Sequence, residues 1–190
     1  MNLLPPKLPA PSAMSSATFA TFIGPITIAI VSTAAAIDLD RRRIPNWLTL
    51  GSWIAALPMQ VAIHGIAAGS LAWLYGWIAG LIIFLPFYLL RGMAAGDVKL
   101  MAAVGAWLGA SMVPSIAVAT WLIGGAWALA MLLVTGQTRA TLSRVGNMLL
   151  SAAIHRGHGL AKSGGKSSAG SIPYGVAIAG GTLAMLFFGM

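Results

Sequence analysis

The stretch AAGDVKLMAAVG, Ala94–Gly105, places Asp97 beside Gly96 at the edge of a long apolar run. The 190-residue chain contains only three acidic residues, Asp38, Asp40 and Asp97, and none of them is a glutamate. An ionisable side chain at the border of an apolar segment is costly to keep and is often functional. Asp97 is therefore the first candidate functional residue.

The composition predicts an all-α, polytopic integral membrane protein. Hydrophobic residues make up 58% of the chain and charged residues only 7%, and the mean hydropathy is +0.88. A soluble domain carries roughly 25% charged residues, so this chain lacks the charge to cover a water-exposed surface. The absence of cysteine excludes disulfides, thiolate zinc sites and a cysteine nucleophile.

Six apolar segments approach the roughly 20 residues that a membrane-spanning helix needs. They are approximately Ala17–Ile37, Trp47–Ile63, Ser70–Leu90, Asp97–Val113, Ser115–Thr135 and Pro173–Phe188. The fourth segment is the shortest, because its apolar part from Val98 to Gly109 covers only about 18 Å at 1.5 Å per residue. We interpret it as a short or tilted span, and a re-entrant segment is the alternative.

The basic residues predict the orientation in the membrane. If the loop after the first span is cytoplasmic, ten of the eleven Lys and Arg residues lie on the cytoplasmic side and only Lys7 lies outside. The ten are Arg41, Arg42, Arg43, Arg91, Lys99, Arg139, Arg144, Arg156, Lys162 and Lys166. We therefore expect both termini to be external. The net charge of +8 is explained by this asymmetry, and no nucleic-acid partner is expected.

The remaining segments are expected to be less ordered. Residues 1–16 predict a flexible tail, and residues 17–190 a single membrane domain with a cytoplasmic loop at about 136–172. Within that loop, Thr138–His158 has apolar residues at helical spacing, which indicates an amphipathic helix on the membrane surface or packed on the bundle. His155 and His158 have no nearby carboxylate or cysteine, so a metal site is not expected.

Asp38 and Asp97 are predicted to lie at the same depth of the membrane. Asp38 ends the first span and Asp97 begins the fourth, both at the cytoplasmic face. Each has a purely structural interpretation: Asp38 as a helix-end charge beside the arginines, and Asp97 as the N-cap of its helix. Asp40, followed by three arginines, is expected to be solvated.

Taken together, the two acids suggest a catalytic pair. Like charges at short range prevent both carboxyl groups from ionising easily, so one keeps its proton. The ionised carboxylate can then activate a water molecule, while the protonated one hydrogen-bonds a substrate carbonyl. This chemistry needs neither metal nor cofactor. Gly96 lacks a side chain and is expected to allow a substrate backbone close to Asp97.

Three blocks in order give a resemblance to a known family. They are DLDRRRIPNWLTL at Asp38–Leu50, AGDVKLMAAVGAWLG at Ala95–Gly109 and IPYGVAIAGG at Ile172–Gly181. Together they resemble the type IV prepilin peptidases, most closely the short form of tight-adherence (Flp-type) pilus systems.

The resemblance implies an aspartic protease of the bacterial inner membrane. Such enzymes remove the leader of prepilins or pseudopilins at the cytoplasmic face, and the motifs carry the catalytic roles over to Asp38 and Asp97. Pilus or secretion assembly machinery is then a possible partner, beside the lipid bilayer. The family's G-x-G-D pattern is altered here, with Ala94 at the first glycine. The cysteine pairs of longer members are absent, so N-methyltransferase activity is not expected.

Other functions remain open at the level of sequence. Buried aspartates also serve small transporters and proton pathways, although those acids tend to lie near mid-membrane. A catalytically impaired pilus-assembly subunit is a third possibility, because of Ala94. Presenilin-like proteases share the Gly-x-Gly-Asp pattern, but this chain lacks their Pro-Ala-Leu block.

Overall fold

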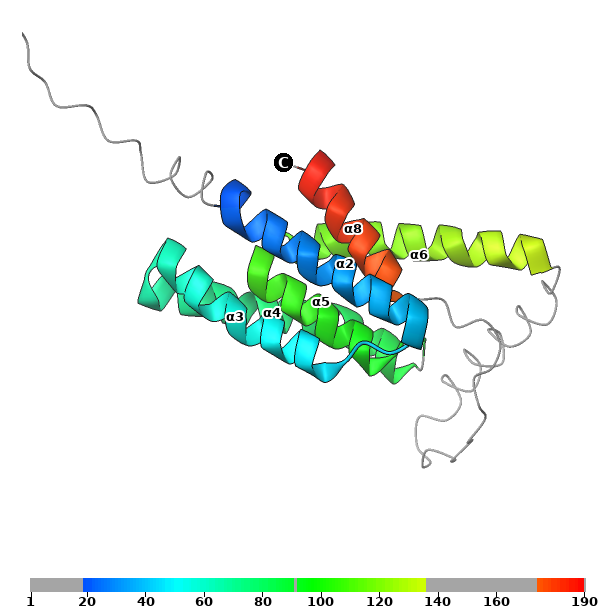
Figure 1. The fold of residues 1–190 in the computed structure, drawn as a ribbon, viewed down its shortest axis with the longest axis horizontal. Coiled ribbons are helices and arrows are strands. Elements are labelled where there is room, and N and C mark those ends of the chain that lie inside the picture. The colour runs from blue at the N-terminus through cyan, green and yellow to red at the C-terminus, as the bar shows by residue number, and fades with distance from the viewer. Residues whose placement is uncertain (1–18, 91, 136–173, 190) are drawn as a thin grey trace, which may run out of the picture.

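The computed structural model describes residues 19–90, 92–135 and 174–189, and in these ranges it is entirely helical. Figure 1 shows the helices lying side by side in a bundle. The elements are η1 (Phe19–Ile23), a π-helix, and the α-helices α2 (Gly24–Arg41), α3 (Asn46–His64), α4 (Ile66–Leu89), α5 (Ala95–Leu108), α6 (Val113–Thr135) and α8 (Tyr174–Phe188). The predicted fold class is confirmed for this part of the chain. The predicted tail and the cytoplasmic loop with its amphipathic segment lie outside the described residues.

The α-helices follow the six predicted segments in order. Three stretches in the described ranges are long and apolar enough to cross a membrane: Thr21–Arg41, Ile66–Leu89 and Val113–Met131. A shorter apolar helix, α8, covers Tyr174–Phe188. These features are those of a multi-pass membrane protein, while a total of six spans and the external termini stay predictions.

The end of the fourth segment differs from the prediction. We expected a helix up to about Val113, but α5 ends at Leu108, and Val113 instead begins α6. The cause is Gly109, whose φ of 84° lies in the left-handed region that glycine adopts without strain. Its N–H donates a hydrogen bond of 2.8 Å to the carbonyl oxygen of Gly105 and closes the last turn.

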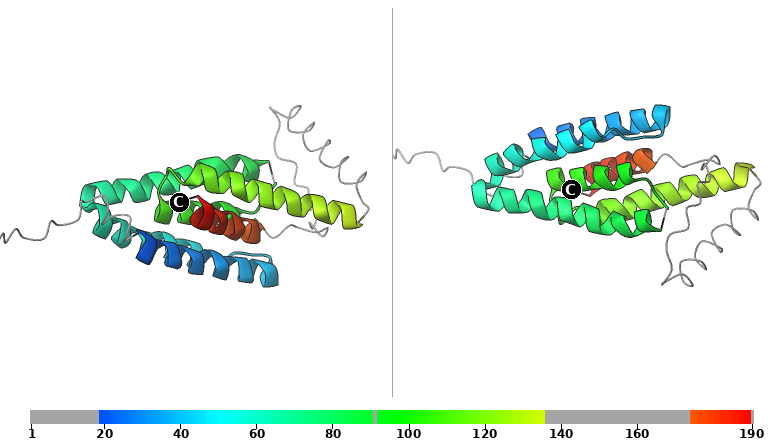
Figure 2. Two further views of the ribbon diagram at one scale, coloured as in Figure 1. Left: turned by 90° about the horizontal axis from the view of Figure 1, so that it is seen from above. Right: turned by 90° about the horizontal axis from the view of Figure 1, so that it is seen from below.

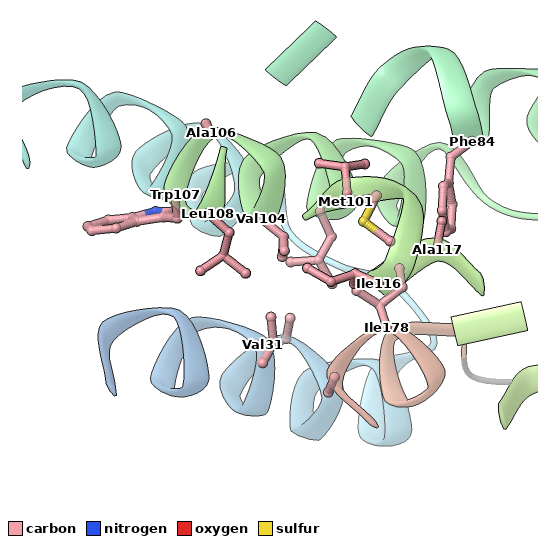
Figure 3. Packing of buried hydrophobic residues seen from close by; sticks show 14 of the residues in the cluster. Val31, Phe84, Met101, Val104, Ala106, Trp107, Leu108, Ile116, Ala117 and Ile178 are labelled. Atoms are coloured by element: carbon pink, nitrogen blue, oxygen red, sulfur yellow. The ribbon is translucent and has the colours of Figure 1, made fainter. Parts of the chain in front are cut away.

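Helix α5 lies at the centre of the bundle. All its residues from Asp97 to Leu108 are buried except Lys99. Figure 2 shows the bundle from two further sides. In Figure 3, Val31 of α2 and Ile178 of α8 point toward α5 from one side. A helix that is apolar on all sides is buried by its neighbours on all sides. The helix that carries Asp97 is therefore enclosed by the rest of the bundle.

Glycines allow α4 to lie directly against α5. A β-carbon on Gly80 would lie 2.6 Å from the Cα of Ala102, and one on Gly76 would collide with the backbone of Gly105. Such close approach is typical of small residues at helix contacts in membranes.

Polar contacts from α3 fix α5 along its axis. The side-chain amide of Gln60 donates hydrogen bonds to the carbonyl oxygens of Ala106 and Trp107, at 3.0 and 2.8 Å. The ring N–H of Trp107 lies 3.0 Å from the carbonyl oxygen of Ser52, to which it donates. The last carbonyls of a helix have no partner within it, so Gln60 caps α5 and holds its register against α3.

Candidate active site

Asp38 lies in the last turn of α2 and is only 6% exposed. The helix ends soon after it, because Arg42 adopts a left-handed conformation with φ 51° and its N–H donates to the carbonyl oxygen of Asp38. The carboxylate itself accepts a hydrogen bond of 2.9 Å from the N–H of Gly175, in the first turn of α8. Asp38 is thus held between two helices that are distant in sequence.

Asp97 is the third residue of α5 and is only 4% exposed. Its carboxylate accepts a hydrogen bond of 3.1 Å from the N–H of Ala94, which occupies the N-cap position. Asp97 is therefore not the N-cap itself, but it does satisfy an N–H at the start of its own helix, as acids in this position do. This structural role uses one carboxylate oxygen, Oδ2, and does not exclude a catalytic one.

The structure brings the two predicted acids together in one pocket. Asp38 and Asp97 both line a cavity of about 270 Å³ at the ends of α2 and α5. The other lining residues are Arg42, Arg43, Ile44, Ala94, Ala95 and Gly96. A space of this size holds several water molecules, and the two buried carboxyl groups are the acids that face it.

Asp40 lies outside this pocket. Its side chain is 78% exposed, and a carboxylate oxygen lies 3.5 Å from Nε of Arg41, which is equally exposed. It lines a separate, larger pocket of about 680 Å³ together with Arg43 and Trp47. The expectation that Asp40 is solvated is confirmed.

Gly96 makes room for the loop between α2 and α3. A β-carbon on Gly96 would lie 3.2 Å from the β-carbon of Ile44, so the loop packs directly on this glycine. Gly96 also lines the pocket of the two acids. Its predicted role in admitting a substrate backbone stays a prediction.

Ala94, the departure from the G-x-G-D pattern, adopts φ −82° and ψ 155°. Any residue can adopt this extended conformation, so the backbone does not require glycine at this position.

Lys99 points to a neighbour other than Asp97. Its ammonium group donates a hydrogen bond of 2.9 Å to the side-chain oxygen of Asn46, and the side chain is exposed. The sequence allows two roles for Lys99, reaching to the cytoplasmic water with its charged end or tuning Asp97, and the bond to Asn46 favours the first. Among the described residues, no three His, Cys, Asp or Glu side chains are grouped so that they could hold a metal ion.

The contribution of α8 to the site was missed by the sequence analysis. The block IPYGVAIAGG contains Gly175, but a backbone N–H leaves no trace in the side-chain pattern. The sequence did offer one signal: the block IPYGVAIAGG follows, in order, the two blocks that contain Asp38 and Asp97.

The fold and the site define a class of protein: a helical membrane protein in which two buried acids from separate helices share a pocket. Comparison with known sequences identifies the family. Residues 25–129, more than half of the chain, match the type IV leader peptidase family. The chain belongs to this family.

Several curated relatives are prepilin leader peptidases. The "Prepilin leader peptidase/N-methyltransferase" of Neisseria gonorrhoeae is 33% identical over 127 residues, which cover 62% of this chain and 43% of the relative. The protein of the same name from Legionella pneumophila is 34% identical over 137 residues, or 65% and 45% of the two chains. This chain thus spans less than half the length of these relatives. No solved structure matches it significantly.

Proposed function

We propose that this protein is a membrane aspartic endopeptidase that removes the leader peptide of prepilins or pseudopilins. The observation that carries the proposal is the shared pocket of Asp38 and Asp97, both buried, in a chain of the leader peptidase family. Burying an acid costs free energy, and two buried acids that face one cavity can act together in hydrolysis.

The two carboxyl groups act on a water molecule between them. The ionised group takes a proton from the water, which attacks the scissile carbonyl carbon. The protonated group donates a hydrogen bond to the carbonyl oxygen and stabilises the negative charge that develops there. When the tetrahedral intermediate collapses, the carbon–nitrogen bond breaks, and the carboxyl group that took the proton from the water gives it to the leaving amine. The N–H groups of Ala94 and Gly175 each hold Oδ2 of one carboxyl group, and in the proposed reaction the two Oδ1 atoms carry out this chemistry.

The proposed topology places the pocket at the cytoplasmic face of the bacterial inner membrane. It comprises six spans with external termini and follows from the basic residues, ten of which fall on the side of Asp38 and Asp97. A prepilin presents its leader on that side, followed by an apolar helix in the membrane. Because this face is positively charged, hydrophobic docking of the apolar helix, and not attraction of a basic leader, supplies most of the affinity.

Only the peptidase activity is proposed. The names of the relatives include an N-methyltransferase activity, but they describe proteins more than twice as long as the matched region. The short Flp-type form, with its pilus or secretion assembly partners, is the context that the sequence motifs favour.

The test is leader removal from a candidate prepilin that is co-expressed with the protein. We expect cleavage by the parent protein and by Asp40→Asn, and none by Asp38→Asn or Asp97→Asn, each checked for equal membrane levels. Full cleavage by either of the last two variants would contradict the assignment of Asp38 and Asp97 as the catalytic pair. If the parent protein does not cleave the prepilin but is needed for pilus assembly, it is an assembly subunit and not a peptidase.

A further inference from the structure

The N-terminus of α8 contacts the carboxylate of Asp38. Gly175 is the second residue of α8, and the first N–H groups of a helix have no acceptor within it. Its N–H donates to Oδ2 of Asp38 at 2.9 Å, and both residues are buried. The positive end of the helix dipole adds to this attraction for a carboxylate.

The contact also leaves no space for a side chain. A β-carbon on Gly175 would lie 2.8 Å from Oδ2, 3.0 Å from the β-carbon and 3.1 Å from the carboxyl carbon of Asp38. The first of these distances is shorter than real β-carbon contacts, so even a methyl group would displace the carboxylate. The hydrogen bond and the close packing thus fix the same oxygen.

Helix α8 cannot simply move away from Asp38, because α6 supports it from another side. A β-carbon on Gly181 would lie 2.7 Å from the backbone nitrogen of Thr120 and 3.0 Å from the carbonyl oxygen of Ile116, so α8 and α6 are already in backbone contact. Figure 2 shows α8 between α2 and α6. A residue larger than glycine at position 175 would therefore act on Asp38 and not on α8.

We propose that Gly175 is a positioning residue that sets the Asp38 carboxylate relative to Asp97. It lies outside residues 25–129, the part that matches the family, so the C-terminal helix completes a site whose acids lie in the matched part. This inference rests on the proposed function, because Asp38 is assigned there as one of the two catalytic acids.

The kinetic test compares Gly175→Ala with Gly180→Ala in purified, detergent-solubilised protein cleaving a prepilin. Both substitutions add one methyl group to α8, but a β-carbon on Gly180 meets only the side chain of Ile123, at 3.1 Å from its flexible end. A misplacement of about 1 Å can cost roughly 100-fold in rate. We expect Gly175→Ala to lower kcat by about this factor with KM unchanged, and Gly180→Ala to keep both. If Gly175→Ala keeps the kcat of the parent protein, or if only its KM changes, the proposal is overturned.

A second test does not depend on activity. The chain has no cysteine, so the double variant Asp38→Cys with Gly175→Cys introduces a single pair. The two β-carbons would lie 3.0 Å apart, closer than the separation of about 3.5–4.5 Å found in disulfides, so a small outward shift of either residue brings the two sulfurs into bonding range. Mild oxidation should link residues 38 and 175, as measured by mass spectrometry of the peptides, whereas the pair Asp40→Cys with Gly175→Cys should stay unlinked.

The outcomes of the two tests are distinguishable. A parent protein that does not cleave would remove the proposed function, while the cross-link would still decide whether α8 holds residue 38. A folded double variant without the link would overturn the contact and with it the role of Gly175, whatever the parent protein cleaves.

Discussion

The side-chain amide of Gln60 lies 2.8 Å from the main-chain carbonyl oxygen of Trp107 and donates a hydrogen bond to it. This contact joins α3 to the last turn of α5, and a second bond to Ala106 strengthens it. Gln60 is only 3% exposed, so water does not replace these bonds if the amide is lost. Gln60 thus holds one end of the central helix, together with the bond from Trp107 to Ser52, while the other end carries Asp97.

Gln60→Met keeps the length of the side chain but removes both donors. Because a buried carbonyl without its partner costs about 1–3 kcal/mol, we expect a clear loss of stability. The measurement is thermal unfolding of the detergent-solubilised protein. Thr33→Val is the matched control, since Thr33 bonds only to a carbonyl in its own helix and is exposed. An unchanged melting temperature for Gln60→Met would show that the cap is dispensable.

The contact between α4 and α5 should not tolerate a methyl group at Gly80. A β-carbon there would lie 2.6 Å from backbone atoms of α5, and overpacking of this kind costs about 1–3 kcal/mol. Gly80→Ala should therefore unfold at a lower temperature than the parent protein. Gly51→Ala is the comparison, because a β-carbon at Gly51 meets nothing within 4 Å and the helix propensity improves by up to about 1 kcal/mol. Equal stability of the two variants would contradict the close approach of α4 to α5.

Restoring the family's glycine should change little. Ala94 adopts an extended conformation that alanine and glycine share, so Ala94→Gly removes only an exposed methyl group. We expect its rate of prepilin cleavage to equal that of the parent protein, measured in the same co-expression assay. A large gain in rate would show instead that Ala94 impairs the enzyme and would favour the interpretation as an assembly subunit.

Lys99 should be dispensable for cleavage. Its ammonium group bonds to Asn46 at an exposed position and does not line the pocket of the acids. Lys99→Gln is expected to cleave like the parent protein and to change stability by no more than about 0.5 kcal/mol, as surface substitutions do. Loss of cleavage with unchanged stability would mean that its charge acts on Asp97 after all.

The proposed orientation can be mapped with single cysteines in this cysteine-free chain. Asp40 lies near the end of α2, where the loop to α3 begins, and His64 lies at the far end of α3. Both side chains are exposed. A membrane-impermeant thiol reagent applied to whole cells should label His64→Cys but not Asp40→Cys, and broken cells should label both. The reverse pattern would place the acids outside and rule out cleavage at the cytoplasmic face.

Much of the helix layout could be predicted from the sequence, because membrane helices are long apolar segments between polar breaks. Helix α3 begins within one residue of its predicted start, where Pro45 precedes it. The end of α5 could not be predicted in the same way. Gly105 continues the helix and Gly109 stops it, and only their backbone conformations, set by packing, tell them apart.

The acids themselves were predictable, since only three occur in the chain and one of them is followed by arginines. Because both acids were expected at the same depth of the membrane, their proximity was also predictable. The N–H donors that hold them were not predictable. Every residue but proline carries such a group, so only the three-dimensional arrangement could single out Gly175.

Ile44 lies in the loop between α2 and α3, beside both acids. It follows shortly after the end of α2, which carries Asp38, and its side chain rests on Gly96, the neighbour of Asp97. Ile44 also lines the pocket that Asp38 and Asp97 share, so a single apolar side chain of the loop between α2 and α3 borders both acids.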